Sequence, residues 1–158
     1  MEHKTENHSY LSFAINGKLY AVHVQAIIEV LDKQPITEVP KAPKHIKGVI
    51  SFRGEIIPVI DARLVMDLPA EDLNDFVIIV LTVKNERYDE YLTVGTIADN
   101  VSNVIEIKPL DIVPATKFNS QIDPKYTLGV STIDSSFVTI LDTDHIFALS
   151  TNKNPDNN

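Results

Sequence analysis

Two short stretches of this chain hold side chains that could bind a metal ion. The run Asp142-Thr143-Asp144-His145 offers three ligating groups, but such a run is also typical of a turn followed by a helix N-cap. The acidic segment 67–75 could bind calcium, but it lacks the glycine and the regular oxygen spacing of a calcium loop. Its carboxylates belong to Asp67, Glu71, Asp72 and Asp75. We therefore interpret both stretches as structural or solvated, and we expect neither a metal nor a cofactor.

Residues that could transfer protons are also few. The sequence contains no Gly-Lys-Ser/Thr phosphate loop, no Gly-x-Ser-x-Gly elbow and no His-Glu-x-x-His pair. His23 lies in an alternating segment, where we expect it to point away from the core. A small β-barrel enzyme would require a buried acid–base pair, and finding His23 and Glu29 buried together would favour that alternative. We expect no catalytic residue.

One charged residue stands at a predicted hairpin tip. Phe52-Arg53-Gly54-Glu55 separates two apolar runs, which is typical of a strand, a tight turn and a returning strand. An arginine in this position is either an ordinary solvent-exposed charge or a side chain held toward a partner. The internal repeat described below distinguishes these two interpretations.

Composition excludes several classes of protein. The chain has 158 residues, 44% of them hydrophobic, a formal net charge of −8 and no cysteine. The acidic balance argues against a nucleic-acid surface and against a polybasic membrane anchor. Without cysteine there can be no disulfide or thiol nucleophile. The N-terminus lacks the apolar region of a signal peptide, so we expect a cytoplasmic protein whose association with membranes is only indirect.

The pattern along the chain is that of short β-strands. We expect polar, flexible ends at 1–9 and 150–158, with one domain at 10–149 between them. Alternating or apolar runs separated by turn signals predict small β-barrels or a sandwich. The predicted strands cover 10–15, 19–24, 27–31, 46–52, 56–60, 76–83, 91–98, 101–107, 129–133 and 137–141. Asn16-Gly17 predicts a tight hairpin turn. Pro-containing connections occupy 35–47, with one helical turn expected at 43–47, and 108–128; a short helix is expected within 142–149.

A weak internal repeat predicts two similar lobes. Gly48 and Gly129 each open a strand, and a second strand ends in an aspartate thirteen residues later, at Asp61 and Asp142. A looser match aligns 21–31 with 95–105. Each lobe is too small to bury much surface alone, so we expect the two to share an apolar seam. The aspartates recur and are predicted to cap the following turns.

Arg53 does not recur, because its counterpart is Asp134. A feature present in only one copy is a better candidate for function than one present in both. The repeat therefore favours a positioned arginine over a solvent-exposed charge.

Two long segments carry a family resemblance. YLSFAINGKLYAVHVQAIIEVL (10–31) and KAPKHIKGVISFRGEIIPVIDAR (41–63) resemble the CheW-like domain of bacterial chemotaxis, and the resemblance covers about residues 9–149. The matching positions are Tyr20, Val22, Val24, Ile27, Glu29, Val30, Pro43, Ile46, Gly48, Val49, Arg53, Gly54, Pro58, Asp61, Arg63, Gly95, Asp99, Val101 and Val104. The resemblance implies an all-β fold of two pseudo-symmetric, interleaved five-stranded β-barrel lobes (SH3-like) with short helical turns.

The resemblance also implies a non-catalytic adaptor that links a CheA-type histidine kinase to the cytoplasmic tip of a chemoreceptor. The receptor's helical hairpin would occupy a groove between the lobes, and the kinase would bind exposed strand edges of the first lobe. The implied receptor-binding residues are Ile27, Glu29, Gly48, Arg53, Gly54, Val101 and Val104. The implied kinase-binding residues are Leu19, Val30 and Leu31.

The sequence departs from the family pattern next to these residues. Leu31-Asp32 stands where the family often has Arg-Gly, and Ser51-Phe52 stands where it often has Asn-Leu. These departures leave open a CheW-like scaffold in a different kinase system, controlling motility or a second messenger. The regulatory domain of a kinase is a further alternative, although the native-looking start Met1-Glu2 argues against it.

Overall fold

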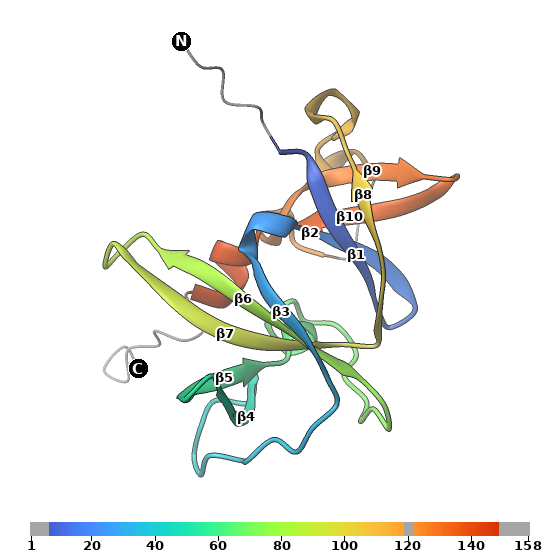
Figure 1. The fold of residues 1–158 in the computed structure, drawn as a ribbon. Helices are drawn as coiled ribbons and strands as arrows, with labels where there is room; N and C mark the ends of the chain where they lie inside the picture. Colours follow the sequence, from blue (N-terminus) through green and yellow to red (C-terminus); the bar gives the residue numbers. More distant parts are fainter. Residues whose placement is uncertain (1–6, 119–121, 149–158) are drawn as a thin grey trace.

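The computed structural model describes residues 7–118 and 122–148, which form two five-stranded β-sheets (Figure 1). Sheet A has the strand order β8-β1-β2-β10-β9, and sheet B has the order β3-β6-β7-β5-β4. Each sheet with its connections makes one barrel lobe, so the expected all-β, two-lobe architecture is confirmed. The strands are β1 (Ser9–Ile15), β2 (Lys18–His23), β3 (Ile27–Asp32), β4 (Ile46–Phe52), β5 (Glu55–Ile60), β6 (Val77–Asn85), β7 (Glu90–Ala98), β8 (Asn100–Glu106), β9 (Thr127–Ile133) and β10 (Ser136–Leu141).

The two lobes exchange strands. β1 and β2 lie in sheet A, but the 3-10 turn η1 (Val24–Ala26) takes the chain across to sheet B, where β3, β4 and β5 lie. The second half of the chain does the reverse, with β6 and β7 in sheet B and β8, β9 and β10 in sheet A. The predicted repeat is therefore real, and its two copies are interleaved.

Tight turns join the strands of three hairpins. Both central residues of the turn have positive φ at Asn16-Gly17, Arg53-Gly54 and Asp134-Ser135. This is the backbone of the turns that match the right-handed twist of paired strands. The hairpins predicted on either side of these residues are confirmed.

The recurring glycines and aspartates have structural roles. Gly48 and Gly129 both have positive φ, and a Cβ atom on Gly48 would lie 2.2 Å from the carbonyl oxygen of Thr37. Asp61 Oδ1 accepts a hydrogen bond from the Arg63 amide at 3.0 Å. Asp142 Oδ1 accepts one from the His145 amide at 3.1 Å. Both aspartates therefore cap the turn that follows them, as predicted.

The helical segments are all short. The connection at 35–47 has a hydrogen-bonded turn in which Ile46 donates to Pro43 at 3.0 Å, where a helical turn was expected. The segment predicted to contain a short C-terminal helix, 142–149, forms a π-helical turn, η5 (Asp144–Ala148), and only its last residue lies outside the described residues. The others are α1 (Ala62–Val65), η2 (Pro109–Asp111), η3 (Ala115–Phe118) and η4 (Pro124–Tyr126).

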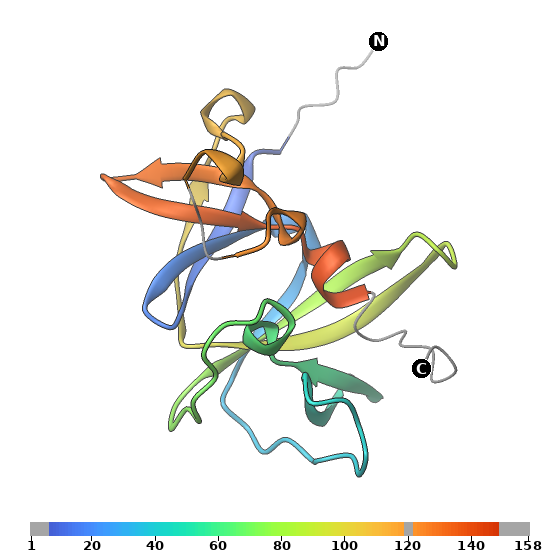
Figure 2. The ribbon, with the colours of Figure 1, turned by 180° about the vertical axis from the view of Figure 1, so that it is seen from behind.

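The largest hydrophobic core lies between the sheets. It joins Phe13 and Val22 of sheet A to Ile79 and Leu81 of sheet B, and Phe147 of η5 completes it. Figure 2 shows η5 in red between the two sheets. Each lobe has a smaller core of its own. The apolar seam predicted from the repeat is thus the main core of the molecule.

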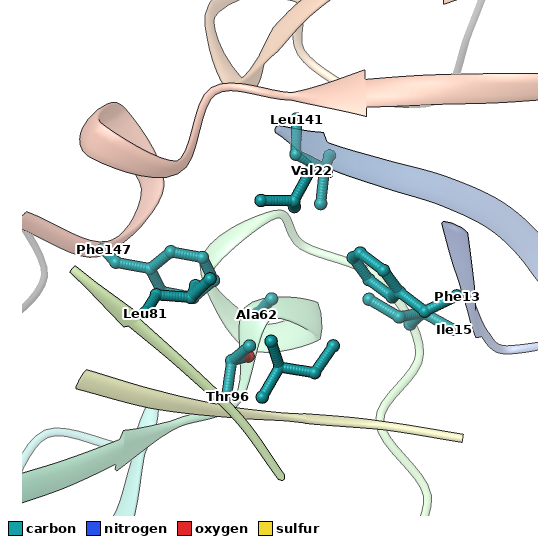
Figure 3. Close-up of a pocket in the computed structure, with 9 residues that line it drawn as sticks. Phe13, Ile15, Val22, Ala62, Leu81, Thr96, Leu141 and Phe147 are labelled. Atoms are coloured by element: carbon teal, nitrogen blue, oxygen red, sulfur yellow. The ribbon is translucent and has the colours of Figure 1, made fainter. Parts of the chain in front are cut away.

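A small apolar cavity lies within this seam (Figure 3). Its lining comes from both sheets, from α1 and from η5, and consists of Phe13, Ile15, Val22, Ala62, Ile79, Leu81, Thr96, Leu141 and Phe147. The one polar side chain among them, Thr96, donates its hydroxyl to the Ile60 carbonyl at 2.9 Å. The cavity therefore presents no free polar group to a ligand, and we assign it to packing.

Candidate functional site

Arg53 occupies an unusual backbone conformation for its residue type. It lies at the tip of the β4–β5 hairpin with φ of +51°, followed by Gly54 at +84°. A left-handed backbone is common for glycine, asparagine and aspartate but uncommon for arginine. The equivalent turn of the other copy uses Asp134, at +48°. Local preference therefore does not explain the arginine, whereas a role for its side chain does.

Two neighbours hold the Arg53 side chain in place. Its Nη2 atom donates to Glu29 Oε1 at 2.8 Å, and its guanidinium carbon lies 4.8 Å from the ring centroid of Phe52. The side chains of Arg53 and Glu29 are 64% and 42% exposed. An ion pair this exposed contributes less than about 1 kcal/mol to stability. Its main effect is to fix the direction of the arginine and to join the hairpin tip to β3.

Two of the predicted receptor residues on strands lie at equivalent positions of the two repeats, and the counterpart of a third is a kinase candidate. Ile27 on β3 corresponds to Val101 on β8, and Val30 corresponds to Val104. β3 is the end strand of sheet B, and β8 is the end strand of sheet A. Ile27 and Val101 are partly buried against the seam core, whereas Val104 is 63% exposed. The two end strands therefore expose apolar side chains next to the junction of the lobes.

Side chains on other strands fix the position of β8. The register of β1 and β8 shifts between Leu11 and Phe13, and Ser12 fills this irregularity. The Ser12 hydroxyl donates to the Asn103 carbonyl at 3.0 Å and accepts from the Asn103 amide at 3.2 Å. Asp99, just before β8, accepts from the Gly17 amide at 3.2 Å. The sequence identified Asp99 only as a position of the family motif. Its place between the apolar predicted strand 91–98 and the next predicted strand, 101–107, was the signal that could have indicated its hydrogen bond to the turn.

The two predicted receptor-binding glycines have reasons of their own to be glycine. Gly48 is buried, and the backbone of Thr37 occupies the place of its side chain. Gly54 has positive φ and no atom within 4 Å of the position of a Cβ, so only the turn requires it. Internal geometry therefore accounts for both residues, and their contact with a receptor stays a prediction.

The three predicted kinase-binding residues do not lie on one lobe. Leu19 is on β2, in the middle of sheet A, and packs with the core of that lobe. Val30 and Leu31 are on β3, at the end of sheet B, and Leu31 packs with the core of that lobe. The prediction of one first-lobe surface is wrong in this respect, because the chain crosses between the sheets after β2. Val30, which is 38% exposed, and Leu31 stay candidates on a shared strand.

The other candidates for chemistry have structural partners. Asp142 accepts from the His145 amide, and Asp144 accepts from the Lys84 amide at 2.8 Å. Among residues 7–118 and 122–148 no group of three or more potential ligands is arranged to hold a metal ion. His23 Nδ1 accepts from the Gln25 amide at 3.1 Å, so its protonated Nε2 donates to the Asn7 carbonyl at 2.5 Å. His23 and Glu29 are therefore engaged with different partners.

No helix in the described part of the chain is long and apolar enough to cross a membrane.

Two interleaved barrels with apolar end strands and a positioned surface ion pair define a protein-binding module. The family model of the CheW-like domain matches residues 9–150, and the chain belongs to this family. Proteins of this family are scaffolds of chemotaxis signalling rather than enzymes.

Individual relatives support the assignment. The chain is 30% identical over 139 residues to "Chemotaxis protein CheW" of Rhizobium meliloti, which covers 87% of this chain and 85% of the relative. It is 32% identical over 139 residues to the protein of the same name in Thermotoga maritima, covering 86% and 85%. Among solved structures, the scaffolding protein TtCheW of Thermoanaerobacter tengcongensis is similar, with a TM-score of 0.78, 26% identity and coverage of 93% and 92%.

Proposed function

We propose that this chain is a chemotaxis coupling adaptor that links a CheA-type histidine kinase to the cytoplasmic tip of a chemoreceptor. The observation that carries the proposal is the match to the CheW-like domain over residues 9–150, almost the whole chain. It would act without turnover, in the cytoplasm, and would meet the membrane only through the receptor.

For the receptor we propose the region where the two end strands approach the junction of the lobes. Ile27 and Val101 supply apolar surface there, Val104 extends it, and the Arg53–Glu29 pair adds charge. An amphipathic helix suits such a surface, because its apolar face covers the valines and isoleucine. Arg53 would fix the register of the helix by charge-assisted hydrogen bonds.

For the kinase we propose the exposed side of β3 around Val30 and Leu31. An end strand offers unpaired backbone groups together with side chains, which is a common basis of protein association. Leu19 lies on the other lobe, so its contact with the kinase would need a surface that extends across both lobes.

The test is a pull-down with the kinase and a receptor cytoplasmic fragment from the same organism. The variant Arg53→Ala should fold normally, keep the kinase and weaken receptor binding by about 1.5–3 kcal/mol, the range of a hydrogen bond to a charged group. If the wild type retains neither partner, the proposal is wrong.

Two further variants separate binding from folding. Arg87→Ala removes an arginine from the tip of the β6–β7 hairpin, where it also lies over a neighbouring ring, 5.5 Å from the Tyr88 centroid. It should bind the receptor as the wild type does. Arg53→Asn removes the charge but suits the left-handed turn, so its expected loss of receptor binding could not result from a strained backbone. An unfolded Arg53→Ala protein would instead make the arginine structural.

A further inference from the structure

The connection between β3 and β4 carries an excess of positive charge. Residues 41–47 contain Lys41, Lys44 and Lys47 and no acidic residue, in a chain whose net charge is −8. The equivalent segment of the second copy, 122–128, contains one lysine and one aspartate. The two segments therefore differ in charge although they occupy equivalent places in the repeat.

The backbone framework is the same in both segments. The amide of Asp61 donates to the carbonyl of His45 at 2.8 Å, and the amide of Asp142 donates to the carbonyl of Tyr126 at 2.9 Å. Isolated bridges join Thr37 to Val49 and Val113 to Val130. Because the framework recurs, the backbone alone does not require the additional lysines.

Each lysine of the first copy differs from its counterpart in a way that leaves positive charge uncompensated. Lys41 and Lys47 stand where the second copy has Ile122 and Leu128. Lys44 corresponds to Lys125, but Lys125 Nζ lies 4.0 Å from Asp123 Oδ2, whereas the first copy has Ala42 at the position of that aspartate. Within residues 7–118 and 122–148, none of the three first-copy lysines forms an ion pair with a carboxylate.

The connection is held firmly enough to present these charges in fixed places. The Thr37–Val49 bridge is closed by hydrogen bonds of 3.0 and 2.8 Å, and the Ala42 amide donates to the Val39 carbonyl at 3.2 Å. Pro40 and Pro43 restrict the backbone further. Lys41 has φ of +64°, a left-handed conformation that is uncommon for lysine and that the surrounding bonds maintain.

The position of the connection selects the partner. It follows directly after β3 (Ile27–Asp32), the strand that carries the kinase candidates Val30 and Leu31, and Figure 1 shows it in cyan at the end of the molecule away from β8. Arg53 lies at the far end of β4 from Lys47, roughly 20 Å along the strand at about 3.3 Å per residue. The lysines therefore lie on the connection that leaves the strand of the kinase candidates, away from the hairpin tip that carries Arg53.

We propose that Lys41, Lys44 and Lys47 form a docking site for a carboxylate-rich segment of the kinase. This inference rests on the proposed function and adds the chemistry by which the kinase is selected. An acidic chain would repel an acidic partner, and a local cluster of lysines reverses that repulsion at one place on the surface. Charges of this kind mainly accelerate association and fix orientation.

The test compares two triple variants of the full chain with equal change of charge. The first variant replaces Lys41, Lys44 and Lys47 with glutamine. The control makes the same replacement at Lys108, Lys117 and Lys125, in the equivalent connection of the second copy. Association with the CheA-type kinase is measured by surface plasmon resonance at low and high salt. We expect the first variant to associate about tenfold more slowly at low salt, with the difference lost at high salt, and the control to stay within about twofold of the wild type.

Several results would overturn the inference. Equal slowing in both variants would mean that only net charge matters, and unchanged association in the first variant would mean that the lysines do not meet the kinase. The inference would also be wrong if phosphatidylglycerol vesicles bound the wild type but not the first variant while the association with the kinase stayed unchanged, because the lysines would then meet a lipid surface. If the wild type binds no kinase at any salt concentration, the proposed function itself fails, and this inference fails with it. Unfolding curves of both variants should match the wild type, because the three first-copy lysines are not ion-paired in the described part of the fold and the Lys125–Asp123 pair removed in the control is exposed to water.

Discussion

Two arginines of this chain form ion pairs of nearly equal length with opposite consequences. Arg53 Nη2 lies 2.8 Å from Glu29, and Arg63 Nη2 lies 2.9 Å from Asp61. The first pair is exposed to water, whereas the side chains of Arg63 and Asp61 are only 4% and 1% exposed. Burial decides their roles, because water screens the first pair and cannot replace either partner of the second.

All three nitrogens of the Arg63 guanidinium donate a hydrogen bond inside the protein. Nε and Nη2 donate to the two carboxylate oxygens of Asp61, both at 2.9 Å, and Nη1 donates to the Glu71 carbonyl at 2.9 Å. The hydrogen bonds that Arg63 donates to Asp61 raise the pKa of Arg63 above its ordinary value, so the guanidinium is charged at every working pH. Arg63 thereby fastens the acidic connection before β6 to the start of α1.

Replacing this arginine should destabilise the fold strongly. Arg63→Ala leaves the Asp61 carboxylate buried without its counter-charge, so the free energy of unfolding should fall by about 3–5 kcal/mol. Urea unfolding followed by circular dichroism measures the change. Arg87→Ala, at an exposed turn, should stay within about 0.5 kcal/mol of the wild type. A loss below about 1 kcal/mol for Arg63→Ala would show that water reaches Asp61.

At the scale of elements, the repeat uses glycine to bring a connection against a strand. The Thr37–Val49 bridge passes over Gly48, and the Val113–Val130 bridge passes over Gly129. A Cβ atom on Gly129 would lie 2.4 Å from Ile112 Cγ2 and 2.8 Å from the Val113 carbonyl oxygen. Each glycine therefore permits one connection to close its lobe.

Gly48→Ala should consequently cost more than an alanine at a turn glycine. The new methyl group would meet the Thr37 backbone at 2.2 Å, and backbone atoms cannot move aside as a flexible side chain does. We expect a loss of about 2–4 kcal/mol in the free energy of unfolding, above the usual range for overpacking because backbone strain adds to it. Gly54→Ala, which meets no atom within 4 Å, is the control and should lose only about 1 kcal/mol. Equal losses in thermal or urea unfolding would mean that the connection can shift away from β4.

The elements were predictable from local signals, and their assembly was only partly so. Alternation and the Asn16-Gly17 signal identified the strands and turns, because side-chain direction and turn backbone depend on neighbouring residues. The exchange of strands depends on contacts between distant residues, so Leu19 was assigned to the wrong neighbours. Arg63 was matched to the family motif, but its burial was not foreseen, because only the folded chain brings the Glu71 carbonyl to it. Arg53 and Glu29 were each named, yet their ion pair joins residues 24 positions apart.

At the scale of the whole molecule, the exchange of strands makes each lobe depend on the other. Each half of the chain supplies strands to both sheets, and the seam core is the largest of the three. Lobes of about 70 residues are marginal by themselves, since they bury too little of their surface. We therefore expect the two lobes to unfold as one cooperative unit.

Phe147 provides the test of this cooperativity. It is 1% exposed, lies in the seam core and borders the cavity, so Phe147→Ala enlarges an existing void. The free energy of unfolding should fall by about 3–5 kcal/mol, the usual cost of removing a buried phenylalanine. Hydrogen exchange of the β1 and β6 amides should then accelerate by the same factor, because both sheets open together. Val138→Ala, in the core of sheet A alone, should also accelerate exchange in both sheets, with a smaller loss of stability. Acceleration confined to one sheet in either variant would instead show that each lobe is stable without the other, and that the seam joins two independent folding units.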